Sequence, residues 1–294
     1  MNNRSRSLLV LVCCALSFGG WKCKGYDAGM ESSNLDSTAV ARVAVDGIGA
    51  ISGAALSLNP AAHTAEATTS TCATAVNQGC DNNFFKSVTY SGCQIAGTSY
   101  TATGNIQLQY NISGCRYLNL DDNVRRTMSP NLTVTGTNGY TLETTTDAHR
   151  TYVPNLDIGG GTVIYRANGY TTINIDGISK THYDSQHNVI EDTSIRTSAP
   201  FHSTDVTGST ITISSGTLNV YQNISHFTTV ITVKDLVLTP AACCHPVSGS
   251  ATLKTVLENG AIASTGTLKF SSTCGQATYT QDNQALPILL ESCQ

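Results

Sequence analysis

Apolar and polar residues alternate along much of this 294-residue chain, and this alternation constrains the fold more than any other feature. Successive side chains of a β-strand point to opposite faces of a sheet, so a period of two predicts strands with one buried and one solvated face. Asn-Gly pairs between such stretches are the strongest short-range signal for a hairpin turn. The alternating stretches are 106–112, 132–134, 173–175, 211–213, 218–220 and 230–238, and the Asn-Gly pairs are 138–139, 168–169 and 259–260.

We therefore predict an all-β protein with large antiparallel sheets, arranged as a sandwich or as an open or closed barrel, with one N-terminal helix and several disulfides. Charged residues make up 12% of the chain, about half the usual share. Their place is taken by hydroxyl-bearing and β-branched residues, which favour strands over helices. The formal net charge of −4 offers no basic surface for nucleic acid.

The N-terminus has the features of an export signal. Two arginines precede an apolar run, Leu8–Leu16, that is too short to cross a bilayer, which needs about 20 residues. Small residues at 15, 17 and 19 suit signal peptidase. We predict a signal peptide over 1–20 and a linker over 21–35, with no transmembrane span in the mature chain.

A lipoprotein signal is the alternative, with Cys14 or Cys23 as the lipidated residue. Neither cysteine is preceded by the small residues that lipidation requires. We expect the protein in the periplasm or on the outer cell surface of a Gram-negative-type bacterium, with lipid anchoring left open.

A single stretch of the mature chain has a helical pattern. Asp36 and Ser37 can cap a helix whose apolar residues fall on one face, and Asn59-Pro60 ends it. Glycines within it lower its helix propensity by about 1 kcal/mol each. We predict a helix over 36–58, a linker over 59–83 that contains Cys72 and Cys80, and an antiparallel β domain over 84–294.

The cysteines predict a disulfide framework. Eleven occur, and three of them lie within the first 23 residues. An even number of cysteines behind an export signal indicates disulfides formed in an oxidising compartment. The remaining eight are Cys72, Cys80, Cys93, Cys115, Cys243, Cys244, Cys274 and Cys293.

Turn geometry suggests how these cysteines pair. A three-residue hairpin loop at 258–260 sets Cys244 opposite Cys274, and a similar loop at 103–105 sets Cys93 opposite Cys115. Directly opposed residues are close enough for a disulfide. The predicted pairs are therefore Cys93–Cys115 and Cys244–Cys274, with Cys72–Cys80 and Cys243–Cys293 as the remainder.

The C-terminal cysteine pattern resembles that of uncharacterised bacterial cell-envelope proteins. It runs from Cys243-Cys244-His245-Pro246 through Ser248-Gly249 and 267–270 to Cys274-Gly275. Such proteins are β-rich and are exported or lipid-anchored, so the resemblance implies an envelope location. It implies no activity.

Candidates for chemistry are few, and each has a simpler explanation. Histidines with a neighbouring aspartate are candidates for a metal site, but their spacing matches no metal motif and scattered surface histidines are the commoner case. A polar turn at 119–123 has oxygen ligands for calcium without the glycine and glutamate of an EF-hand loop. Carboxylates are candidates for glycoside hydrolysis, and strand tyrosines are candidates for stacking on sugars, although solvated loop carboxylates and half-buried strand tyrosines are commoner. The residues concerned are His182, Asp184, His187, His202 and His226; Glu143, Asp147 and Asp157; and Tyr165, Tyr170, Tyr183 and Tyr221.

We therefore expect a non-enzymatic, exported cell-envelope protein with a structural or binding role, without a cofactor or a metal. Its partner would be another envelope component or an apolar ligand. A carrier that holds a small apolar ligand inside a curved sheet is one alternative. A glycan-active enzyme that works through carboxylates is the other.

Overall fold

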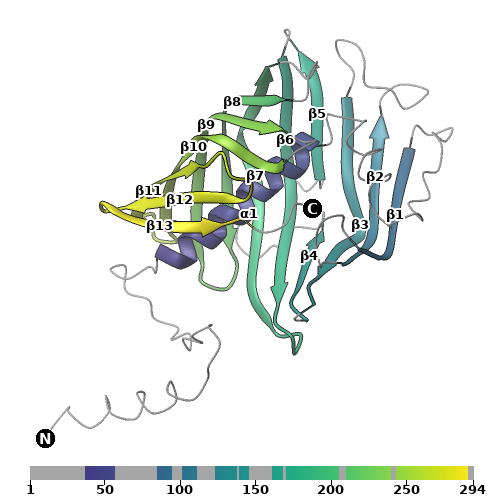
Figure 1. The fold of residues 1–294 in the computed structure, drawn as a ribbon, viewed down its shortest axis with the longest axis horizontal. Coiled ribbons are helices and arrows are strands. Elements are labelled where there is room, and N and C mark those ends of the chain that lie inside the picture. The colour runs from purple at the N-terminus through teal and green to yellow at the C-terminus, as the bar shows by residue number, and fades with distance from the viewer. Residues whose placement is uncertain are drawn as a thin grey trace, which may run out of the picture. The chain divides into compact units, whose positions relative to one another are not determined.

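The computed structural model describes residues 37–56, 85–94, 101–110, 123–137, 139–145, 161–167, 170–204, 210–239 and 243–290. All of them belong to one compact unit, Leu35–Gln294. They form one α-helix, α1 (Ser37–Leu56), and thirteen strands in a single sheet (Figure 1). The expected signal peptide and both expected linkers lie outside the described residues.

The strands follow one another along the sheet in nearly the order of the chain, and every pair is antiparallel. Strand β5 departs from this order, because it pairs with both β3 and β6. The predicted fold class is therefore confirmed. The strands are β1 (Phe85–Gln94), β2 (Thr101–Tyr110), β3 (Asn123–Thr135), β4 (Thr141–Thr145), β5 (Gly161–Ala167), β6 (Tyr170–Tyr183), β7 (Val189–Thr204), β8 (Ile211–Gln222), β9 (Phe227–Thr239), β10 (Cys243–Leu257), β11 (Ile262–Phe270), β12 (Gln276–Gln281) and β13 (Gln284–Leu289).

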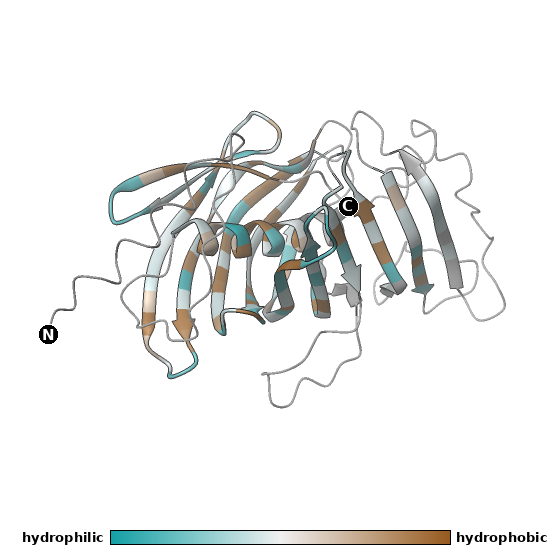
Figure 2. Ribbon diagram, turned by 90° about the horizontal axis from the view of Figure 1, so that it is seen from below, coloured by the Kyte–Doolittle hydropathy of each residue, from teal (hydrophilic) through white to brown (hydrophobic). Residues whose placement is uncertain are grey.

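The alternation in sequence becomes an alternation in burial. Along β8 and β9, apolar residues such as Leu218 and Ile231 are fully buried, whereas the residues that alternate with them, such as Thr217 and Thr232, are partly or fully exposed. Figure 2 shows this as brown and teal segments that follow one another along the strands. The buried face of the sheet points toward α1.

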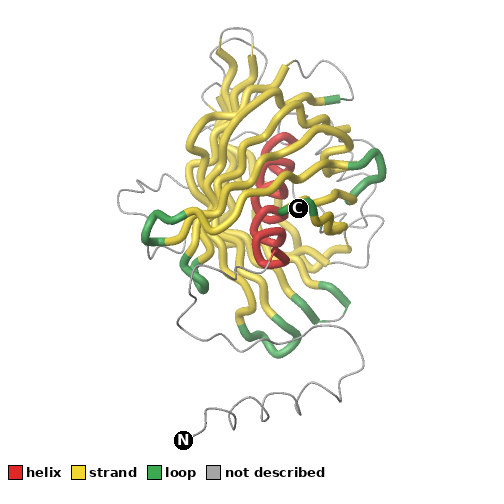
Figure 3. Tube along the Cα trace, turned by 90° about the vertical axis from the view of Figure 1, so that its left-hand side faces the viewer, coloured by secondary structure: helices red, strands yellow, loops and turns green. Residues whose placement is uncertain are grey.

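Helix α1 lies inside the curve of the sheet and packs against β6 to β10 (Figures 1 and 3). Its apolar residues Val40, Val43, Ile48 and Ile51 are at most 1% exposed. The sequence predicted this helix over 36–58, but as a segment ahead of the β domain. The structure instead makes it part of the core of that domain, because the curved apolar face of the sheet needs a cover.

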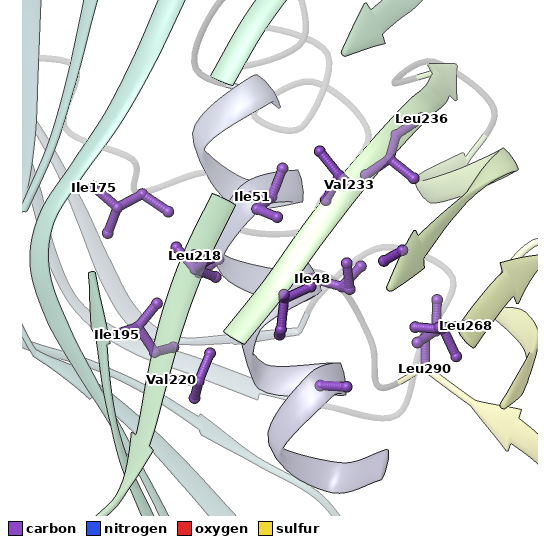
Figure 4. Packing of buried hydrophobic residues seen from close by; sticks show 14 of the residues in the cluster. Ile48, Ile51, Ile175, Ile195, Leu218, Val220, Val233, Leu236, Leu268 and Leu290 are labelled. Atoms are coloured by element: carbon purple, nitrogen blue, oxygen red, sulfur yellow. The ribbon is translucent and has the colours of Figure 1, made fainter. Parts of the chain in front are cut away.

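Gly47 lets the helix approach the sheet closely. A Cβ atom at this position would lie 2.6 Å from Ile231 Cδ1 and 2.9 Å from Val220 Cγ2. Both side chains belong to the buried core cluster, in which Figure 4 labels Val220. A glycine that weakens the helix on propensity alone is therefore required by the packing.

The turn predicted at Asn259-Gly260 is confirmed. Residues 258–261 separate β10 from β11, Gly260 has a φ of 82°, and its amide donates to the Leu257 carbonyl at 2.9 Å. The left-handed conformation explains why glycine occurs there. Gly139, with a φ of 81°, similarly lies between β3 and β4.

The hairpin predicted at 103–105 is wrong. Gly104 lies within β2, where its backbone passes so close to Asn131 and Leu132 of β3 that a Cβ would clash. The actual pairing of β1 with β2 sets Cys93 opposite Ala102, not opposite Cys115. The register argument for a Cys93–Cys115 disulfide therefore fails, and Cys115 itself lies outside the described residues.

The disulfide near the C-terminus joins Cys243 to Cys274, with a Cα–Cα distance of 5.6 Å. The predicted pairs Cys244–Cys274 and Cys243–Cys293 are therefore wrong. The β10–β11 register begins as expected, with Val256 opposite Ile262, but an irregularity beside Thr255 shifts all later pairs by one residue. A one-residue slip turns each side chain to the other face, so the register that set Cys244 opposite Cys274 does not hold. Cys72, Cys80 and Cys293 lie outside the described residues.

Candidate functional site

A buried carboxylate connects α1 to the sheet. Asp46 has a side chain that is 3% exposed. Its Oδ1 atom accepts a hydrogen bond from His182 Nε2 at 2.9 Å, and its Oδ2 atom accepts one from Thr193 Oγ1 at 2.8 Å. Lys180 Nζ lies 4.0 Å from Oδ1. These four residues are called the helix anchor below.

The strand register brings the helix anchor together. Lys180 and His182 are two residues apart on β6, so they share a face. Thr193 lies directly opposite Lys180 on β7, and Glu191, also buried, lies opposite His182. All of them face the helix, where a Cβ at Gly49 would lie 2.8 Å from Lys180 Nζ.

Opposing effects set the ionisation of Asp46. Burial raises its pKa, but the positive charges of His182 and Lys180, with the hydrogen bonds from His182 and Thr193, outweigh burial and hold the pKa below its ordinary value. The carboxylate is therefore ionised at neutral pH. The carboxylate can orient the imidazole of His182. Because the helix anchor is buried between helix and sheet, it is suited to fixing the helix in place.

The histidines proposed as a metal site do not converge. His182 points into the helix anchor, whereas Asp184 accepts hydrogen bonds from Gln186 and Asn188 in its own turn. His187 stacks on Tyr183 with ring centroids 4.4 Å apart, and His202 Nδ1 lies 3.4 Å from Thr172 Oγ1. Within the described part of the chain, no three His, Cys, Asp or Glu side chains form a group that could hold a metal ion.

His226 belongs to a different cluster, at the ends of two neighbouring hairpins. Tyr221 donates its hydroxyl proton to Glu258 Oε1 at 3.1 Å, and the same hydroxyl oxygen lies 2.9 Å from His226 Nδ1. His226 Nδ1 and Glu258 Oε1 are 3.5 Å apart. Tyr221 is the penultimate residue of β8, His226 precedes β9 and Glu258 follows β10. We call these three residues the Tyr-His-Glu cluster.

Only some of the residues in the carboxylate and calcium hypotheses are among those that the structure describes. Glu143 lies on β4, and its charge and that of Asp192 act on Tyr183, whose pKa is raised by burial first and by these two carboxylates next. Asp147, Asp157 and residues 119–122 lie outside the described residues, as do the side chains of Tyr165 and Tyr170.

Sequence reasoning named His182, His226 and Tyr221 under separate hypotheses, but it predicted neither the helix anchor nor the Tyr-His-Glu cluster, and Glu258 was not a candidate. One signal for the anchor was available. Asp46 is a single acidic residue among the apolar residues of α1, and such a residue needs a partner when it is buried. Nothing in the spacing of residues 221, 226 and 258 indicated that strand pairing would gather them.

The geometry defines the chain as an all-β protein in which a curved antiparallel sheet encloses a helix. No known protein family, curated protein or solved structure matches it. Among the residues that the structure describes, no helix is long and apolar enough to cross a membrane. The resemblance to bacterial cell-envelope proteins therefore stays a prediction that rests on the C-terminal cysteine pattern.

Proposed function

We propose that the protein is a non-enzymatic, exported component of the cell envelope whose role is structural or binding. One observation carries the choice between this role and that of an apolar-ligand carrier. The apolar face of the sheet is filled by the chain's own helix, which packs closely at Gly47 and is held by the helix anchor. Contacts with a partner would then be made by outer surfaces.

The carrier alternative requires the helix to leave that face. Departure would expose Ile48 and Ile51 together with Leu218 and Ile231, all fully buried. Exposing a buried side chain of this size costs about 1.5–3 kcal/mol each. It would also leave Asp46 without the partners that stabilise its charge.

A ligand-displacement assay tests this choice. Titration of the protein with a fluorescent fatty acid should give no saturable binding at micromolar concentrations. Saturable binding that is lost when a cysteine pair locks α1 to β8 would support the carrier instead.

The disulfide between Cys243 and Cys274 supports export, because structural disulfides persist in oxidising compartments. N-terminal sequencing of protein from the native host tests this part of the proposal. The expected sequence begins just after residues 17–20. A retained Met1, or a lipid-modified Cys14 or Cys23, would contradict a soluble exported protein.

A further inference from the structure

The Tyr-His-Glu cluster has the geometry of a metal site. We infer that Tyr221, His226 and Glu258 bind a divalent transition-metal ion of the Zn²⁺ type. The three donor atoms are Tyr221 Oη, His226 Nδ1 and Glu258 Oε1, and their separations are 2.9, 3.1 and 3.5 Å. They come from the ends of three neighbouring strands, so an ion there would join the β8–β9 and β10–β11 hairpins.

The separations between the donors are close to those of tetrahedral coordination, and two of them are slightly shorter. Zinc binds nitrogen and oxygen at about 2.0–2.2 Å, so two such ligands at a tetrahedral angle stand about 3.3–3.6 Å apart. The triangle formed by the three donors would have to open by only a few tenths of an ångström. The side chains of His226 and Glu258 are 46% and 45% exposed. An ion can therefore enter from solvent, and water can complete its coordination.

The local structure holds these donors in place. Tyr221 is buried, with an exposed fraction of 6%. Gln222 Oε1 accepts hydrogen bonds from the amides of Ile224 and Ser225, which fixes the turn before β9. His226 ends that turn with a φ of 55°, a conformation that positions its ring beside Tyr221. Little conformational entropy is lost when donors are already oriented.

The type of donor selects the type of ion. Imidazole nitrogen suits Zn²⁺, Cu²⁺ and Ni²⁺, and a carboxylate oxygen is a common companion ligand. Calcium needs six to eight oxygen ligands, and magnesium near-ideal octahedral oxygen coordination, so one imidazole with two oxygens suits neither. The site differs from the group of histidines considered above, since it keeps His226 alone and adds residues from β8 and the β10–β11 turn.

Isothermal titration of the full chain with zinc chloride tests the inference. The protein carries no histidine tag, and its free thiols are alkylated first under non-reducing conditions, so that cysteines do not compete. We expect one ion per chain, with binding weakened tenfold or more in Tyr221→Phe, Glu258→Gln and His226→Asn. Asparagine tolerates the left-handed backbone at residue 226. Zinc should also raise the Tm of the wild type and not of the variants.

His187→Asn is the matched control, because His187 is an exposed turn histidine with a φ of 65° on another hairpin. It should bind zinc as the wild type does. The inference is overturned by absence of zinc binding to the wild type, or by equal binding in the three cluster variants. Equal weakening in His187→Asn and His226→Asn would also overturn it, since it would show non-specific histidine binding.

Discussion

Two consecutive residues of α1 determine how the helix lies on the sheet. Asp46 fixes its rotation, because its carboxylate can reach His182 and Thr193 only when that side faces β6 and β7. Gly47 fixes its distance, because the side chains of Ile231 and Val220 occupy the space of a Cβ. Apolar packing is non-directional and alone would leave the position of the helix less defined. The polar contacts of Asp46 define that position.

Replacing Asp46 by alanine should destabilise the protein by about 3–5 kcal/mol, because it leaves Lys180 and Thr193 buried without their carboxylate partner. Urea unfolding monitored by circular dichroism measures this. Asp176→Ala is the control. Asp176 pairs with Arg125 at 3.0 Å on a more exposed surface, where such pairs contribute about 0–1 kcal/mol. An equal loss of unfolding free energy in Asp46→Ala and Asp176→Ala would contradict the structural role of the helix anchor.

The lowered pKa of Asp46 predicts how stability depends on pH. The folded protein binds the proton more weakly than the unfolded chain, so this carboxylate stabilises the fold above the ordinary pKa of 3.8. That contribution should disappear as pH falls below 3.8 through the folded-state pKa. Urea unfolding between pH 7 and pH 2 should show the wild type losing more stability than Asp46→Asn. Parallel curves would show that Asp46 does not have the lowered pKa.

Gly47→Ala should destabilise the protein, although alanine raises helix propensity by about 1 kcal/mol. The new methyl group would have to displace Ile231 and Val220, and overpacking of this kind typically costs about 1–3 kcal/mol. Gly49→Ala is the comparison, because its Cβ would meet only the flexible end of Lys180. Denaturant midpoints should fall further for the substitution at 47, and the reverse order would contradict the close approach at Gly47.

At the scale of elements, irregularities in strand pairing determine which residues lie opposite each other, and the sequence pattern does not reveal them. The alternation of residues and the Asn259-Gly260 turn suffice to predict strands, a hairpin and its first paired residues. They do not predict the shift beside Thr255 or the further irregularities between Cys243 and Ser250. Such irregularities shift the pairing by one or two residues, and a shift of one exchanges the faces of the strand. The predicted pairing of Cys244 with Cys274 is therefore wrong, although the predicted hairpin between β10 and β11 is confirmed.

Glycines show the same limit of sequence reasoning. Gly260 and Gly104 both suggested turns, yet Gly104 lies in mid-strand because the β3 backbone passes against it. A turn depends on local conformation, which the sequence encodes within a few residues. A close approach depends on a neighbour more than twenty-five residues away, Asn131, and becomes visible only when the strands are paired. The helix anchor was missed for this reason too, because Asp46 and Thr193 are 147 residues apart.

The disulfide between Cys243 and Cys274 gives a prediction for peptide mapping. Digestion without reduction should yield one fragment that contains both residues. Because the bond spans 31 residues, its removal in Cys243→Ser or Cys274→Ser should cost about 3–4 kcal/mol on the chain-entropy model. Cys244→Ser should leave the fragment intact. Recovery of a fragment that joins Cys244 to Cys274 would restore the pairing first expected from the hairpin.

At the scale of the whole molecule, helix and sheet share one hydrophobic core. Val40, Val43, Ile48 and Ile51 of α1 are each at most 1% exposed. Burying four such side chains contributes on the order of 6–12 kcal/mol. That is comparable with the entire net stability of a typical domain, about 5–15 kcal/mol. The sheet therefore depends on the helix, even though the chain between them, 57–84, could be mistaken for a boundary between domains.

Deletion tests this dependence directly. A chain that lacks residues 1–58 should fail to give a cooperative urea transition, because the buried face of β6 to β10 loses the helix that covers it. A chain that lacks only residues 1–34 keeps the compact unit Leu35–Gln294 and should unfold like the full chain. Adding a synthetic peptide of residues 35–58 to the shorter chain should restore folding, and Asp46→Ala in that peptide should weaken the effect. Cooperative unfolding of the chain without residues 1–58 would show that the sheet is stable alone, and the helix would then be a removable cover, as the carrier hypothesis requires.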